Sequence, residues 1–147
     1  MASTRSAAAP EVYAEVLHFY ARQMHMMDGG DFAGFAKTFM EDGVFTLAGG
    51  RGVLEGREAI GAAAEAAEAR YQGGRPRHWF DMMTVEETAD GTLETTYYAL
   101  VSVTARDGSV RFEPSCVVRD TLVRRDGGLL MLSRTITRDD IDRPAAG

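Results

Sequence analysis

The spacing of hydrophobic residues divides the chain into a helical first half and a strand-rich second half. From Glu11 to Met27 they recur three and four positions apart, which is typical of one face of an α-helix. Asp31 can cap a second, short helix that runs through Phe39. A short strand is expected over residues 44–47, and the alanine-rich run from Arg57 to Tyr71 predicts a third helix.

Three Asp-Gly pairs, at residues 90–91, 107–108 and 126–127, punctuate the second half. Asp-Gly between hydrophobic segments is a strong signal for a β-hairpin. The segments between the pairs are 15 and 17 residues long. Strands of that length must twist and bend, and we expect one bend at residues 113–115 beside Pro114.

These elements predict an α+β fold: a cone-like single domain in which three N-terminal helices pack on a strongly curved, long-stranded antiparallel sheet. We expect the domain to span residues 11–140, with a disordered leader over 1–10 and a disordered tail over 141–147. A cone of this kind leaves an internal pocket between helices and sheet, where small-molecule sites tend to lie.

Composition narrows the function classes. The net charge is −6 and the pI is near 5.0, which argues against nucleic-acid binding. The lone Cys116 excludes an internal disulfide, and His18 and His25 lack a third ligand, so we expect neither a metal nor another cofactor. No apolar segment approaches the length of a membrane helix, and we expect a soluble, cytoplasmic protein.

Five motifs occur in the order found in one known family. They are Asp28-Gly29-Gly30-Asp31-Phe32, Phe39-Met40-Glu41-Asp42-Gly43-Val44-Phe45, Gly56-Arg57-Glu58-Ala59-Ile60, Arg77-His78 and residues 120–128 around the last Asp-Gly pair. The chain thus resembles the SnoaL-like branch of the nuclear-transport-factor-two-like superfamily, which contains scytalone dehydratase-type enzymes and polyketide cyclases. The resemblance implies the same cone-like fold, but that fold hosts several reactions and non-catalytic subunits.

Three residues are the candidates for catalysis. His78 begins a predicted strand, where it is either a general acid-base at the pocket wall or an exposed histidine beside two arginines. For Asp28 the resemblance implies a carboxylate that orients this base, whereas the local sequence is equally that of a polar turn residue. Tyr98 matches a second histidine of the dehydratases, and its phenol could donate to a developing oxyanion.

Further residues are expected to contact the substrate. Phe80 and Met82 follow His78 on the same face of the strand by alternation, and Met27, Leu47 and Val118 match positions that are polar in the dehydratases. Tyr20 lies on the apolar face of the first helix and Asp120 shares a face with Val118, so both are weaker candidates of this group.

The leading hypothesis is a cofactor-free cyclase or dehydratase, a lyase or isomerase that acts on an aromatic polyketide-type intermediate in natural-product biosynthesis. The alternative is a non-catalytic ligand-binding or assembly subunit, like the small subunit of ring-hydroxylating dioxygenases. A third option, epoxide opening, would need an arginine such as Arg134 or Arg138 between two carboxylates. Val101, Val103, Val117 and Val123 are expected on the outer face of the sheet, which predicts a homodimer.

Overall fold

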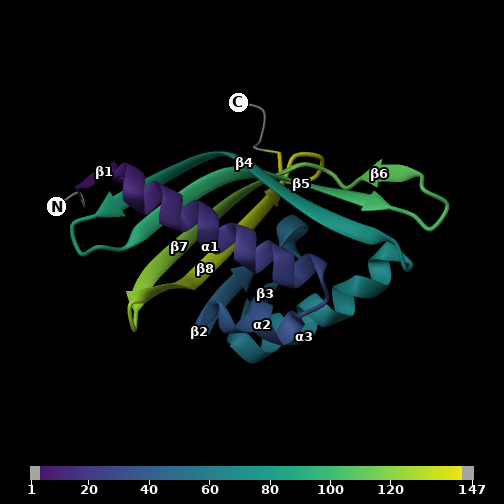
Figure 1. Cartoon of the computed structure of the whole chain (residues 1–147), viewed down its shortest axis with the longest axis horizontal. Helices are drawn as coiled ribbons and strands as arrows, with labels where there is room; N and C mark the ends of the chain where they lie inside the picture. Colours follow the sequence, from purple (N-terminus) through teal and green to yellow (C-terminus); the bar gives the residue numbers. More distant parts are fainter. Residues whose placement is uncertain (1–3, 144–147) are drawn as a thin grey trace.

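A computed structural model describes residues 4–143 of the chain as helices on one side of a curved sheet (Figure 1). The helices are α1 (Pro10–Asp28), α2 (Phe32–Lys37) and α3 (Arg57–Ala67), with short 3₁₀ turns at Ala48–Gly50 and Glu68–Tyr71. The strands are β1 (Arg5–Ala7), β2 (Phe39–Thr46), β3 (Val53–Glu55), β4 (Arg75–Thr88), β5 (Leu93–Thr104), β6 (Val110–Phe112), β7 (Cys116–Arg125) and β8 (Gly128–Arg138). The predicted α+β cone of three helices on a long-stranded sheet is therefore confirmed.

The strand order in the sheet is β1-β4-β5-β7-β8-β2-β3, and β6 pairs with β5. The four long strands form the antiparallel meander that the Asp-Gly pairs predicted. One pairing departs from the expected pattern, because β2 runs parallel to β8. The sheet is thus mostly, not wholly, antiparallel.

The second helix is shorter than predicted. Asp31 caps it as expected, since its carboxylate accepts a hydrogen bond from Gly34 N at 2.9 Å. The helix ends at Lys37, where the hydroxyl of Thr38 donates to the carbonyl of Phe35 at 2.6 Å. Phe39 then starts β2 and is fully buried. Its ring packs in the hydrophobic core of the domain, so residue 39 belongs to the strand and not to the helix.

Two irregularities bend the long strands. The expected bend at residues 113–115 is confirmed as the gap between β6 and β7. A bulge between Asp81 and Thr84 interrupts the β4–β5 register, and Met82 there has a φ of 54°. The extra residue shifts the alternation by one, so Met83 packs against the core while Met82 is 68% exposed. The predicted inward position of Met82 is therefore wrong.

The ends of the described chain are more ordered than expected. Arg5–Ala7 pairs with β4, and Pro10 opens α1, so residues 5–10 are not a disordered leader. Asp142, in the expected tail, accepts hydrogen bonds from Gly49 N at 3.0 Å and from Arg138 N at 2.9 Å. Residues 1–3 and 144–147, the remainder of the two predicted segments, lie outside the described residues.

The core lies between α1 and the concave face of the sheet. Its fully buried members include Val16, Leu93, Tyr97, Leu122 and Met131. Within residues 4–143, every helix falls short of the length or apolar character needed to cross a membrane.

Candidate functional site

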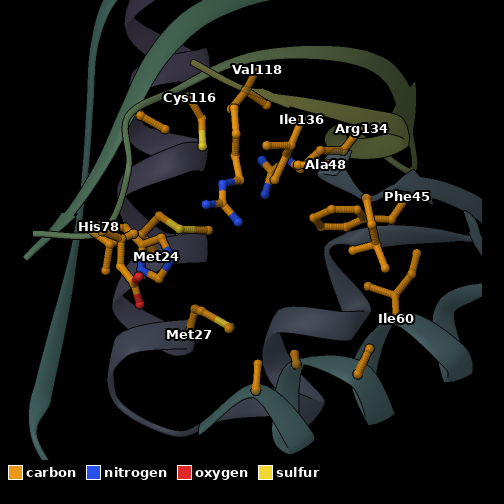
Figure 2. Close-up of a pocket in the computed structure, with 18 of the residues that line it drawn as sticks. Met24, Met27, Phe45, Ala48, Ile60, His78, Cys116, Val118, Arg134 and Ile136 are labelled. Carbon is orange, nitrogen blue, oxygen red and sulfur yellow. The ribbon is translucent and has the colours of Figure 1, made fainter. Parts of the chain in front are cut away.

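A cavity of about 310 Å³ lies between the helices and the concave face of the sheet (Figure 2). Its wall is mostly apolar and includes four of the predicted substrate-contacting residues, Met27, Leu47, Phe80 and Val118. His78 lines the same cavity from β4. The volume falls at the lower end of the range of small-molecule sites.

Asp28 and His78 are in direct contact although 50 residues separate them in the chain. Asp28 is the last residue of α1, and Gly30, with a φ of 81°, turns the chain away just beyond it. One Asp28 oxygen accepts from the main-chain N of His78 at 2.9 Å, and the other lies 2.5 Å from His78 Nδ1. The carboxylate therefore holds both the backbone and the ring of His78.

This contact gives the two ring nitrogens of His78 different hydrogen-bonding roles. A carboxylate can only accept, so the neutral imidazole places its proton on Nδ1 and leaves Nε2 as an acceptor. Nε2 has no hydrogen-bond partner within residues 4–143. The side chain is largely buried but borders the cavity, which is the arrangement of a general base.

A second polar cluster is buried beside the cavity, under α1. The carboxylate of Asp120 accepts from Arg134 Nε and Nη2, both at 3.0 Å, and from the hydroxyls of Tyr20 at 2.6 Å and Tyr97 at 2.7 Å. Arg134 Nη2 also donates to Gln23 Oε1 at 2.9 Å. We call these five residues the Asp120 cluster.

The Asp120 cluster keeps fixed charges in the interior. Burial raises the pKa of Tyr20, and the charge of Asp120 raises it further, so the phenol stays protonated and donates. Burial likewise raises the pKa of Tyr97. For Arg134, burial is the largest single effect and lowers the pKa, but attraction to Asp120, the hydrogen bonds to Asp120 and the neighbouring tyrosine hydroxyls together raise it overall. The guanidinium therefore remains charged.

The comparisons with known proteins agree with this fold. Residues 9–135 match the SnoaL-like domain. The chain belongs to the SnoaL-like family.

Solved structures similar to this SnoaL-like protein include three from Streptomyces and Catenulispora. Aln2 from a Streptomyces species is 60% identical with a TM-score of 0.90, and the match covers 92% of this chain and 96% of that one. ActVI-ORFA from Streptomyces coelicolor is 42% identical with a TM-score of 0.82, covering 88% and 99%. A protein from Catenulispora acidiphila in complex with S-DNPA is 42% identical with a TM-score of 0.82, covering 90% and 96%. A comparison with curated proteins found no match.

Of the predicted site residues in this SnoaL-like chain, Tyr98 is misplaced. Tyr98 is 57% exposed on the outer face of β5, and its neighbour Tyr97 is the tyrosine that points inward and bonds Asp120. Alternation allowed either tyrosine to face inward, and the pairing of β5 with β7 decides for Tyr97, which lies opposite the buried Val118. The predicted orientation of Tyr98 is wrong.

The two weaker candidates, Tyr20 and Asp120, lie behind the cavity wall. Both are buried, and they contact each other in the Asp120 cluster. The sequence prediction missed Gln23 and the pairing of Arg134 with Asp120. Arg134 was named only as a possible epoxide-opening residue. The hairpin at Asp126-Gly127 indicates that the two strands pair, but only the observed register places Arg134 opposite Asp120.

Substituting the adjacent tyrosines tests this assignment. Tyr97→Phe is expected to lower the free energy of unfolding by about 1.5–3 kcal/mol, because it removes a buried hydrogen bond to a charged group. The matched variant Tyr98→Phe is expected to change it by less than about 0.5 kcal/mol, as is usual for an exposed residue. Urea unfolding of both variants measures the difference, and equal losses would contradict the assignment.

The remaining candidate groups do not form a metal site. The described residues contain no group of three or more His, Cys, Asp or Glu side chains that could hold a metal ion. Cys116 lines the cavity, and burial raises the pKa of its thiol, so it is not an activated nucleophile.

Proposed function

We propose that this SnoaL-like protein is a cofactor-free lyase or isomerase, a cyclase or dehydratase that acts by general acid-base chemistry on an aromatic polyketide-type intermediate of natural-product biosynthesis. The observation that carries the proposal is the His78–Asp28 pair at the wall of the apolar cavity. An imidazole oriented by a carboxylate is a common device for moving protons near neutral pH.

In this proposal His78 Nε2 removes an acidic C–H proton next to a carbonyl group of the substrate. In a dehydration the same imidazolium then returns the proton to the leaving hydroxyl. Asp28 acts as a positioning residue, because its two oxygens hold the His78 ring and main chain in place. A charged partner also stabilises the imidazolium that forms.

The substrate class is supported by the cavity and by a relative. Met24, Met27 and Phe80 give the wall flat, apolar and polarizable surfaces that suit a fused aromatic ring system. A similar protein, 42% identical, is in complex with S-DNPA. We propose that this chain accepts a small molecule of comparable chemistry.

The decisive experiment incubates the protein with a set of aromatic polyketide intermediates and follows them by mass spectrometry and proton exchange in D₂O. A dehydratase produces a product lighter by one water, whereas a cyclase or isomerase changes the chromatographic retention without changing the mass. Deuterium incorporation at the carbon next to the carbonyl reports the proton transfer itself. Absence of all three signals for every intermediate that binds would contradict the proposal.

A second candidate function is ligand binding without turnover, as in an accessory or assembly subunit of the same fold. It is favoured by Met27, Leu47 and Val118, three apolar wall residues at positions that the resemblance matches to polar groups of dehydratases. The same incubation separates the candidates, because a binding protein would return each ligand unchanged.

We further propose that the protein is a homodimer, although the valines that predicted it are not all on the outer face. Val101 lines the cavity, and Val103 is buried. The apolar residues exposed on β4, β5 and β6 include instead Trp79, Tyr98 and Phe112, each more than half exposed.

Light scattering after size exclusion at micromolar concentration is expected to give twice the chain mass of 16.0 kDa. The variant Trp79→Glu is expected to shift the protein toward the monomer, because it places a charge in the apolar patch. A monomeric wild type would contradict the dimer.

A further inference from the structure

Arg134 has hydrogen-bonding capacity that the protein itself does not use. A guanidinium carries five N–H donors. Nε donates to Asp120, and the two donors of Nη2 go to Asp120 and Gln23, which accounts for three. The two donors on Nη1 have no partner within residues 4–143, and Nη1 is not enclosed by protein atoms. Arg134 is only 4% exposed and lines the cavity, so these donors face the cavity.

The surroundings fix the guanidinium in this orientation. Its Cζ atom lies 5.8–5.9 Å from the ring centroids of Tyr20, Phe39, Phe45 and Phe80. Asp120 and Gln23 hold the opposite edge. A cation held by rings and by two acceptors, with one nitrogen left open to the cavity, does not need to reorganise when a ligand arrives.

Only the positive member of the Asp120–Arg134 ion pair borders the cavity. Asp120 does not line the cavity, and its carboxylate already accepts four hydrogen bonds, two from Arg134 and two from tyrosine hydroxyls. The positive end of the pair is therefore the end that borders the cavity. In an apolar cavity such a donor pair attracts negatively charged oxygen more strongly than it would in water.

Arg134 and His78 can contact the same ligand. The His78 ring centroid lies 6.3 Å from the centroid of Phe80, and Arg134 Cζ lies 5.8 Å from that same centroid. In Figure 2 the two side chains lie on opposite sides of the cavity, with Phe45 and Ile136 beside Arg134 and Met24 beside His78. A fused aromatic ring system that covers Phe80 would reach both groups.

We propose that Arg134 binds an anionic oxygen of the substrate, the enolate or phenolate oxygen, through the two N–H donors of Nη1. This inference rests on the proposed function and assigns the second half of its chemistry. When His78 Nε2 takes the proton, the C–H electron pair forms the new C=C bond and the carbonyl π pair moves onto oxygen. That oxygen then carries the negative charge and accepts from Nη1.

The role can be tested without turnover, with a ligand that carries a phenolate but no reacting carbon. We suggest 4-nitro-1-naphthol, whose anion is visible by absorbance, and its methyl ether as the matched ligand that cannot ionise. A cationic donor pair favours the anion. The pKa of the naphthol bound to the wild type is therefore expected to fall by at least about one unit, a tenfold preference for the anion.

Two variants remove the donors in different ways. Arg134→Lys keeps a charge beside Asp120, but its ammonium donors are taken by Asp120 and Gln23, so the anion preference is expected to disappear. Arg134→Met combined with Asp120→Asn removes the pair together and avoids a lone buried charge. Arg138→Met is the matched control, since Arg138 also lines the cavity but its guanidinium donates to Asp140. It is expected to keep the preference, and no variant should weaken binding of the methyl ether.

Each outcome decides the proposal. Loss of the anion preference in Arg134→Lys and in the double variant, with retention in Arg138→Met, supports it. Full preference in Arg134→Lys overturns it, and Arg134→Lys alone decides if the double variant does not fold. A wild type that binds only the neutral naphthol, or no naphthol at millimolar concentration, overturns it as well. Anion preference without conversion of any polyketide intermediate would retain the role of Arg134 and reject catalysis by His78.

Discussion

His78→Ala is expected to lower kcat/KM by at least about two orders of magnitude, the usual scale for loss of a general acid-base. The fold should survive, because the main-chain N of residue 78 continues to donate to Asp28 and the carboxylate keeps a partner. Turnover of the intermediate identified by mass spectrometry measures the rate, and circular dichroism checks the fold. Near wild-type activity in this variant would exclude His78 as the base.

Two further variants make this test specific. His25→Ala removes an exposed histidine at the end of the same helix that carries Asp28, and its rate is expected to equal that of the wild type. Asp28→Asn keeps the size of the side chain but removes its charge, so kcat should fall with little change in KM. A change confined to KM would assign Asp28 to substrate binding instead of positioning.

Asp120→Ala is expected to produce the largest loss of stability in the protein, about 3–5 kcal/mol in the free energy of unfolding. The substitution leaves the buried guanidinium of Arg134 without its counter-charge and removes the acceptor of two tyrosine hydroxyls. Chemical denaturation, with the slope compared between variants, measures the loss. A loss below about 1 kcal/mol would show that the Asp120 cluster is not a structural unit.

The matched control is an ion pair on the surface. Glu15 and Arg124 lie 2.8 Å apart, but both side chains are more than two-fifths exposed. Glu15→Ala is expected to cost less than about 1 kcal/mol, because water screens the pair and competes for it. Adding Arg134→Met to Asp120→Ala should recover part of the loss, since the uncompensated charge is then gone.

Most of the fold was accessible from local sequence. The helix of residues 10–28 has a clear 3.6-residue period, and the Asp-Gly pairs mark the hairpins between the four long strands. The second helix was overextended because Phe39 continues the helical spacing of Phe32 and Phe35. Only the packing of β2 against β8 shows that Phe39 belongs to a strand.

The residues of the candidate site also fall into those that the sequence identified and those that it misplaced. Asp28 and His78 were identifiable because each stands at the end of a predicted element, and a family resemblance placed them together. Met82 was placed inward on the assumption of unbroken alternation, which a single bulge in β4 reverses. The spacing of hydrophobic residues does not show where a bulge inserts an extra residue into a strand. Tyr98 was chosen because it matches a second histidine of the dehydratases, whereas alternation by itself allowed either Tyr97 or Tyr98 to face inward.

The Asp120–Arg134 pair shows what the sequence by itself determined and what it left open. The two-residue turn Asp126-Gly127 joins β7 to β8. If the strands paired without a break from that turn, Asp120 would lie opposite Ser133. An extra residue in β8, Leu132, lies between the partners of Thr121 and Leu122 and shifts the register by one, so Arg134 lies opposite Asp120. The chain determined its helices, hairpins and apolar interior through local spacing and turn chemistry. The tertiary structure decided which charged groups meet inside, because a one-residue shift in register moves a side chain from one face of a sheet to the other.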